Sequence, residues 1–196
     1  MASDPDAALM VAFQGGDESA FRTLFEKHGR AMVAFCNHFV RDGARAEELA
    51  QDVFLKVYRS AARYRPSARF KTFLYRIASN HCLNELRRGE YAARRDVERE
   101  RGEPTDPDTL AGAAPTPEET ALAASLGSAV GALLARLPEK QRAAFVLARL
   151  EGLSYDEVAD VLGTSVGAVK SLVHRATVAA SAALGPFTAA GKEALS

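Results

Sequence analysis

The 196-residue chain contains only two cysteines and no long apolar run, and these shortages exclude several classes of protein. Cys36 and Cys82 lie far apart in the sequence and form no CxxC pair, which argues against a disulfide scaffold and fits a reducing cytosol. No run of about 18 apolar residues exists, so a membrane span is not expected. Segment 1–10 lacks a basic region, so a signal peptide is not expected either. We therefore expect a cytoplasmic protein with no direct membrane insertion.

The sequence also lacks the patterns typical of catalysis and of β structure. It contains no P-loop, GxGxxG, HExxH or GxSxG motif, and no nucleophile is paired with a base in a recognisable pattern. His81 and Cys82 are neighbours on an expected helix and point apart, which disfavours a shared metal. No segment shows the sustained two-residue alternation of a strand. We expect an all-α protein without catalytic activity, metal or cofactor.

The formal net charge is zero, but the charges are unevenly distributed. Residues 1–88 carry 14 Lys and Arg against 10 Asp and Glu, residues 89–125 carry 4 against 9, and residues 126–196 carry 7 against 6. This pattern predicts two helical domains joined by an acidic linker, which we expect to be flexible because prolines and glycines interrupt it. The expected boundaries are 1–90 for the first domain, 91–117 for the linker, 118–184 for the second domain and 185–196 for a tail.

Residues 138–176 carry the most specific local signal, that of a helix-turn-helix. Ser154 and Glu157 form a capping box for one short helix, and Gly163 is suited to end it. Ser165 caps the next helix, whose valines repeat at helical spacing on one side. Its other side carries small, polar and basic groups that suit a DNA major groove, although an ordinary pair of packed helices is the alternative. The residues expected to face DNA are Ser165, Val166, Gly167, Lys170, Ser171, His174 and Arg175.

Two further segments carry surface chemistry. Residues 59–88 hold eight basic side chains against one acid, Glu85, with aromatic residues interleaved. Basic groups neutralise phosphates and aromatic rings stack on unpaired bases, so we favour nucleic acid over simple solubility. On the expected helix 44–62, Leu55 interrupts an otherwise charged outer face. A solvated face is the plain alternative, but an apolar residue among carboxylates favours a protein partner.

Taken together, these stretches resemble one family. Residues 46–59 (AEELAQDVFLKVYR) and 70–88 (FKTFLYRIASNHCLNELRR) are similar to the second conserved region of bacterial RNA polymerase sigma factors of the extracytoplasmic-function (ECF) group. Residues 137–176 (LPEKQRAAFVLARLEGLSYDEVADVLGTSVGAVKSLVHRA) are similar to the fourth region, and the order and spacing also agree. The resemblance implies an alternative sigma factor, which directs core RNA polymerase to specific promoters and helps to open them.

The resemblance also implies a role for each surface. The outer face of the 44–62 helix would dock on the clamp helices of the largest polymerase subunit, through Glu48, Gln51, Asp52, Leu55 and Arg59. The basic segment would hold the melted upstream promoter element, through Arg63, Arg65, Arg69, Lys71, Tyr75, Arg76, Asn80, Asn84, Arg87 and Arg88. The helix-turn-helix would read the distal element. An anti-sigma factor, expected to be membrane-bound, would clamp both domains.

The chain departs from the family pattern at several positions. Family members usually carry Trp at the position of Phe73 and Asp at that of Asn84. They usually carry Thr, Arg and a basic residue at the positions of Ala168, Leu172 and Thr177. Because a missing Arg–phosphate contact lowers affinity, we expect weaker binding of the distal element. Two alternatives stay open: a sigma mimic that titrates an anti-sigma factor without binding DNA, and a two-domain repressor that binds its operator without polymerase.

Overall fold

The computed structural model describes residues 4–66, 68–96 and 117–193, with side chains described for 4–66, 68–88 and 127–182. Across these ranges every regular element is a helix and none is a strand, so the all-α prediction is confirmed. The elements are α1 (Pro5–Gln14), α2 (Glu18–Val40), α3 (Gly43–Ser60), the short turn η1 (Ala61–Arg63), α4 (Phe70–Asp96), α5 (Pro117–Arg136), α6 (Glu139–Phe145), the π-helical segment η2 (Val146–Leu150), α7 (Tyr155–Leu162) and α8 (Val166–Glu193).

Aspartate caps begin the first three helices. Asp4, Asp17 and Asp42 each accept hydrogen bonds from backbone N–H groups in the first turn of α1, α2 and α3. Asp4 does more, because its second carboxylate oxygen accepts from the backbone N–H of Phe70 at 2.7 Å, at the start of α4. One side chain near the N-terminus therefore satisfies a backbone donor in the first turn of α1 and another at the start of α4, 66 positions away.

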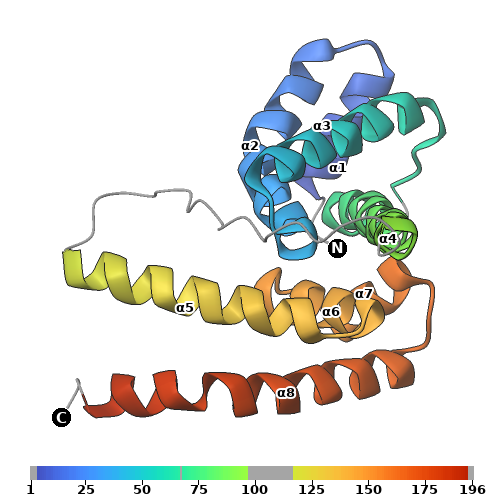
Figure 1. Ribbon diagram of the computed structural model, residues 1–196. Coiled ribbons are helices and arrows are strands. Elements are labelled where there is room, and N and C mark those ends of the chain that lie inside the picture. Colours follow the sequence, from blue (N-terminus) through green and yellow to red (C-terminus); the bar gives the residue numbers. More distant parts are fainter. Residues whose placement is uncertain (1–3, 67, 97–116, 194–196) are drawn as a thin grey trace.

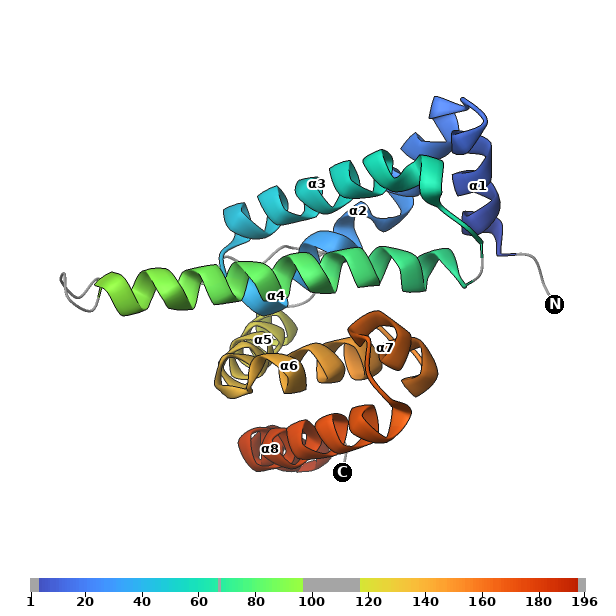
Figure 2. The same ribbon diagram turned by 90° about the vertical axis from the view of Figure 1, so that its right-hand side faces the viewer.

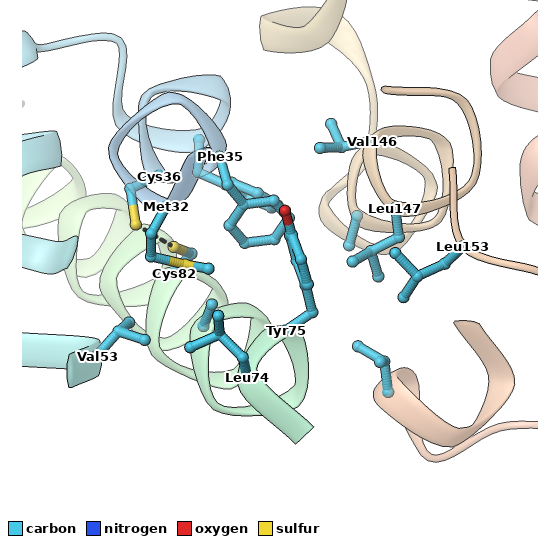
Figure 3. Close-up of a cluster of buried hydrophobic side chains, with 14 of the residues drawn as sticks. Met32, Phe35, Cys36, Val53, Leu74, Tyr75, Cys82, Val146, Leu147 and Leu153 are labelled. Carbon is cyan, nitrogen blue, oxygen red and sulfur yellow. Dashed lines mark hydrogen bonds between the residues drawn. The ribbon is translucent and has the colours of Figure 1, made fainter. Parts of the chain in front are cut away.

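Helices α1 to α4 enclose an apolar core. The buried side chains come mainly from α2, α3 and α4: Leu24, Met32, Phe35, Cys36, Phe39, Leu49, Val53, Val57, Phe70 and Leu74. The thiol of Cys82 donates to the sulfur of Cys36 across 3.6 Å inside this core, and both cysteines are free (Figure 3). Phe25 on α2 is 45% exposed, because position 25 is turned about 100° from buried Leu24, out of the face that α2 packs.

Helices α5 to α8 form the second domain around a core of valine and leucine, including Leu134, Leu147, Val158 and Val169. The helix-turn-helix has the predicted local structure. The Ser154 hydroxyl accepts from the Glu157 N–H at 3.2 Å, and the Glu157 carboxylate accepts from the Ser154 N–H at 2.9 Å. Gly163 ends α7 with φ of 61°, a left-handed conformation that glycine adopts without steric cost.

The last helix is longer than the sequence predicted. The second domain was expected to end at residue 184, before Gly185 and Pro186, but α8 continues to Glu193. Proline removes one backbone donor, yet its fixed φ is itself helical, so a helix can pass through it. Alanines on either side of the proline also favour helix. The predicted linker lies partly outside the described residues, since 97–116 fall between α4 and α5.

The two domains lie directly against each other. Helix α4 lies between α2 and α3 on one side and α6 and α7 on the other (Figure 1, Figure 2). Helix α8 lies on the far side of the second domain, away from α4 (Figure 2). The helix with most of the predicted DNA-binding residues is therefore the central element, and the second domain covers part of it.

Candidate nucleic-acid and protein interfaces

The outer face of α3 has the mixed character that the sequence predicted. Leu55 is 51% exposed, and its neighbours Glu48, Gln51, Asp52 and Arg59 are all exposed too. None of these polar side chains covers Leu55 enough to bury it. An exposed leucine surrounded by carboxylates is the feature that favoured a partner-binding surface.

A groove that sequence reasoning missed adjoins this face. Two neighbouring hollows of about 290 and 280 Å³ lie between α2 and α3. We define the aromatic groove by its apolar lining: Phe13, Phe21, Phe25, Phe54, Leu55 and Tyr58. Two of its ring pairs pack edge to face, with centroids 4.8 Å apart for Phe25 and Phe54 and 5.3 Å apart for Phe21 and Tyr58, while Phe13 is tilted against its neighbours. The available signal was the surplus of aromatic residues on both helices, beyond what one buried stripe can hold.

His81 on α4 contacts two charged side chains of α3. Its Nε2 lies 3.2 Å from the Asp52 carboxylate, and its Nδ1 lies 2.5 Å from the Lys56 amine. Burial, together with the Lys56 charge, lowers the pKa of His81 below its ordinary value, although Asp52 acts in the opposite direction. A neutral His81 can accept from Lys56 and donate to Asp52, which orients that carboxylate. No cluster of three or more metal-binding side chains occurs among the described residues.

Most of the predicted DNA-contacting residues lie on the surface of α4 and the segment before it. Those exposed are Arg63, Arg65, Arg69, Arg76, Asn80, Asn84, Arg87 and Arg88. The single acid of this segment, Glu85, is neutralised from α3, because its carboxylate accepts from the Arg45 Nε at 3.0 Å. The hydrogen bonds that Arg45 donates to the carboxylates of Glu85 and Glu48 raise the pKa of Arg45. The face of α4 therefore keeps its positive character.

Two of the predicted residues are covered by the second domain. Tyr75 is 2% exposed, its ring lies 5.0 Å from Phe35, and its hydroxyl donates to the carboxylate of Glu151. Lys71 donates to the Glu151 backbone carbonyl at 2.6 Å and lies 5.6 Å from the centre of the Tyr75 ring. The expectation that Tyr75 lies on an open surface is wrong in this arrangement. The cause is the turn before α7, which packs on the first turns of α4.

The exposed side of the helix-turn-helix carries the predicted groups. Ser165, Gly167, Lys170, Ser171, His174 and Arg175 are exposed, and Val166 is half-buried. Two of the positions that depart from the family pattern, 172 and 177, have side chains engaged within the fold. Leu172 packs against the core, and the Thr177 hydroxyl donates to the Val173 carbonyl at 2.8 Å. Positions 172 and 177 therefore serve packing and helix bonding rather than an outward contact.

The described residues contain no helix that is long and apolar enough to cross a membrane. This agrees with the absence of a long apolar run in the sequence.

Comparison with known proteins assigns the family. The family model described as Sigma-70 region 2 matches residues 24–90, and that described as Sigma-70, region 4 matches 128–178. RNA polymerase sigma-H factor of Pseudomonas aeruginosa is 34% identical, covering 95% of this chain and 97% of its own. The ECF RNA polymerase sigma-E factor of Haemophilus influenzae is 33% identical, covering 87% and 90%.

Solved structures agree with this assignment. CnrH, in complex with the cytosolic domain of CnrY, has a TM-score of 0.68 and 26% identity, covering 93% of this chain and 99% of its own. The sigma factor RpoE of Bartonella quintana, in complex with the anti-sigma factor NepR, has a TM-score of 0.67 at 22% identity, covering 84% and 96%, which supports the fold alone. Both family regions occur in the expected order along the chain. The chain therefore belongs to the sigma-70 family, as an ECF RNA polymerase sigma factor.

Proposed function

We propose that this sigma factor docks on core RNA polymerase through α3 and the aromatic groove, binds the melted promoter with α4, and reads the distal promoter element with α8. The observation that carries the proposal is that one chain presents three distinct exposed surfaces. These are an acidic–apolar face, a basic face and a helix-turn-helix face, and the family matches cover all three. Because bacterial promoters and core polymerase are in the cytoplasm, we propose that the protein acts there.

The docking surface is proposed from its chemistry. Asp52 and Glu48 provide charges that steer a basic partner, and Leu55 beside the groove provides apolar area that only a partner can bury. Aromatic side chains held in a groove are the kind of anchor on which binding energy concentrates. We assign the clamp helices of the largest polymerase subunit as the partner, with one apolar side chain entering between Phe25 and Tyr58.

We expect the two promoter-binding surfaces, on α4 and α8, to contribute unequally to promoter opening. On α4, exposed arginines and asparagines can hold phosphates and unpaired bases, and holding a flipped base offsets the cost of opening the duplex. On α8, Lys170 and Arg175 are exposed cations on a face of small groups. With Leu172 and Thr177 engaged in the fold, we expect the helix-turn-helix to set position and α4 to supply most of the opening.

We also propose an anti-sigma partner, anchored in the membrane, that controls this protein. The support is the structural neighbour CnrH, which was solved with the cytosolic domain of CnrY. A sigma mimic that only titrates such a partner would share its binding but would need no exposed basic face on α4.

The test combines core enzyme, a two-element promoter and variants of each surface. Wild type with core polymerase should start transcription, and D52R/L55A should lose core binding while its thermal unfolding stays unchanged. E26R and V11A alter exposed residues of α2 and α1 and serve as controls for charge and apolar area. Failure of the wild type to bind core would sink the proposal. Core binding without promoter opening would favour the mimic, and tight DNA binding without polymerase would favour a repressor.

A further inference from the structure

We propose that His81 is a positioning residue for docking on core polymerase: as a neutral ring it holds the Asp52 carboxylate of α3 as an exposed anion, and its protonation weakens docking. The inference rests on the proposed function of α3, because Asp52 is one of the carboxylates assigned to steer the basic partner there. The side chain of His81 is 11% exposed, against 53% for that of Asp52. His81 can therefore act on docking through the side chains of α3 that it contacts.

The two contacts of His81 select one protonation state. Its Nδ1 lies 2.5 Å from the Lys56 amine, and an ammonium group has hydrogen-bond donors but no acceptor. Nδ1 must therefore accept, so the ring is neutral and carries its proton on Nε2. This proton is donated to the Asp52 carboxylate, 3.2 Å from Nε2. Each hydrogen bond from Lys56 through His81 to Asp52 thus fixes the direction of the next.

The charged groups that face His81 come from α3 and from α4 itself. Burial has the largest effect and lowers the pKa of His81, and the Lys56 charge acts in the same direction. Asp52 on α3 and Glu85 on α4 raise this pKa, but they do not restore it to the ordinary histidine value. The neutral ring therefore prevails at neutral pH, and it is lost as pH falls through the lowered pKa of His81.

Protonation of His81 changes the charge of the docking face. A protonated Nδ1 is a donor facing the Lys56 ammonium, so these two like charges must separate. The imidazolium also forms an ion pair with Asp52 and offsets its negative charge. Asp52 lies four positions after Glu48 and three before Leu55, so these three residues share one face of α3. The charge is therefore lost in the middle of the surface proposed to attract a basic partner.

The test measures the affinity of the full-length protein for core polymerase at different pH values, for wild type, H81Q and H38Q. Glutamine offers one donor and one acceptor as the neutral ring does, but it does not titrate. His38 lies half-buried on α2, and burial lowers its pKa too, so H38Q removes a comparable group outside the docking surface. Core polymerase also titrates, so the quantity compared is the ratio of the wild-type dissociation constant to that of each variant. Nuclear magnetic resonance of the imidazole nitrogens in the free protein identifies the tautomer of His81.

We expect wild type and H81Q to bind equally at about pH 8, above the range in which histidine titrates. At about pH 5.5, wild type should bind about fivefold more weakly than H81Q, the effect of neutralising one exposed charge, and H38Q should follow wild type. The neutral ring should carry its proton on Nε2. A wild-type to H81Q ratio that stays constant with pH would overturn the proposal, as would a proton on Nδ1 or an H38Q profile like that of H81Q. Failure of the wild type to bind core even at the higher pH would instead refute the proposed function of α3, and this proposal with it.

Discussion

Replacing Asp4 should destabilise the first domain more than replacing an ordinary helix cap. Asp4 accepts from the Asp6 N–H at 3.0 Å in α1 and from the Phe70 N–H at 2.7 Å in α4. A helix cap contributes about 1 kcal/mol, and a hydrogen bond to a charged group about 1.5–3 kcal/mol. D4A should therefore lower the free energy of unfolding by about 2–4 kcal/mol. D42A, which removes the cap of α3 alone, should lower it by about 1 kcal/mol.

The asparagine variant separates the two roles of Asp4. In D4N the side-chain oxygen can replace only one of the two carboxylate oxygens, because the amide nitrogen cannot accept a hydrogen bond. The free energy of unfolding of D4N should therefore lie between those of wild type and D4A. Urea unfolding followed by circular dichroism measures the free energies. Hydrogen exchange at the Phe70 amide reports the second bond directly, and protection should fall in D4A and stay unchanged in D42A. Equal losses of stability in D4A and D42A, with Phe70 protected in both, would refute the double role.

Three further predictions concern the surfaces. Full burial of a leucine contributes about 1.5–3 kcal/mol, and Leu55 is 51% exposed, so burying it against a partner contributes about 1 kcal/mol. L55A should therefore weaken core polymerase binding about fivefold in a titration. V11A, which alters an exposed apolar residue of α1, should not weaken it. Burial raises the pKa of Glu151 and so favours the folded state as pH falls, whereas at Glu157 burial is outweighed by hydrogen bonds and the Arg69 charge, which lower the pKa of Glu157 and have the opposite effect. Between pH 7 and the ordinary glutamate pKa, E157Q should therefore lose less stability than wild type in urea unfolding, and identical pH profiles would contradict this. R87A/R88A should reduce open-complex formation, followed by permanganate reactivity, more than it reduces core binding.

Local features of the fold could be predicted because they depend on neighbouring residues. The capping box of Ser154 and Glu157 and the end of α7 at Gly163 involve partners within four positions, and both were confirmed. The predicted boundary at residue 184 was wrong for the helix itself, because α8 continues through Gly185 and Pro186 to Glu193. The predicted domain boundaries stay predictions.

The candidate site could be predicted only in part. Exposure of Leu55 follows from helical spacing on α3, and it was confirmed. Burial of Tyr75 depends on Glu151, 76 positions away, and exposure of Phe25 depends on where α1 and α3 leave α2 uncovered. Spacing within one helix says nothing about which other helix will cover it. The packing of Glu151 and Glu157 against α4 could not be predicted for the same reason.

The buried thiol pair has a practical consequence for labelling the protein. Cys36 and Cys82 have no exposed area, and the hydrogen bond between them, together with burial, raises the pKa of Cys82. Since thiolate is the species that reacts with maleimides and disulfide reagents, neither native cysteine should label while the first domain is folded. Single cysteines placed on the outer surfaces of the two domains should therefore accept dyes selectively in the native background. The fold itself thus supplies the chemistry for watching the two domains separate, one molecule at a time.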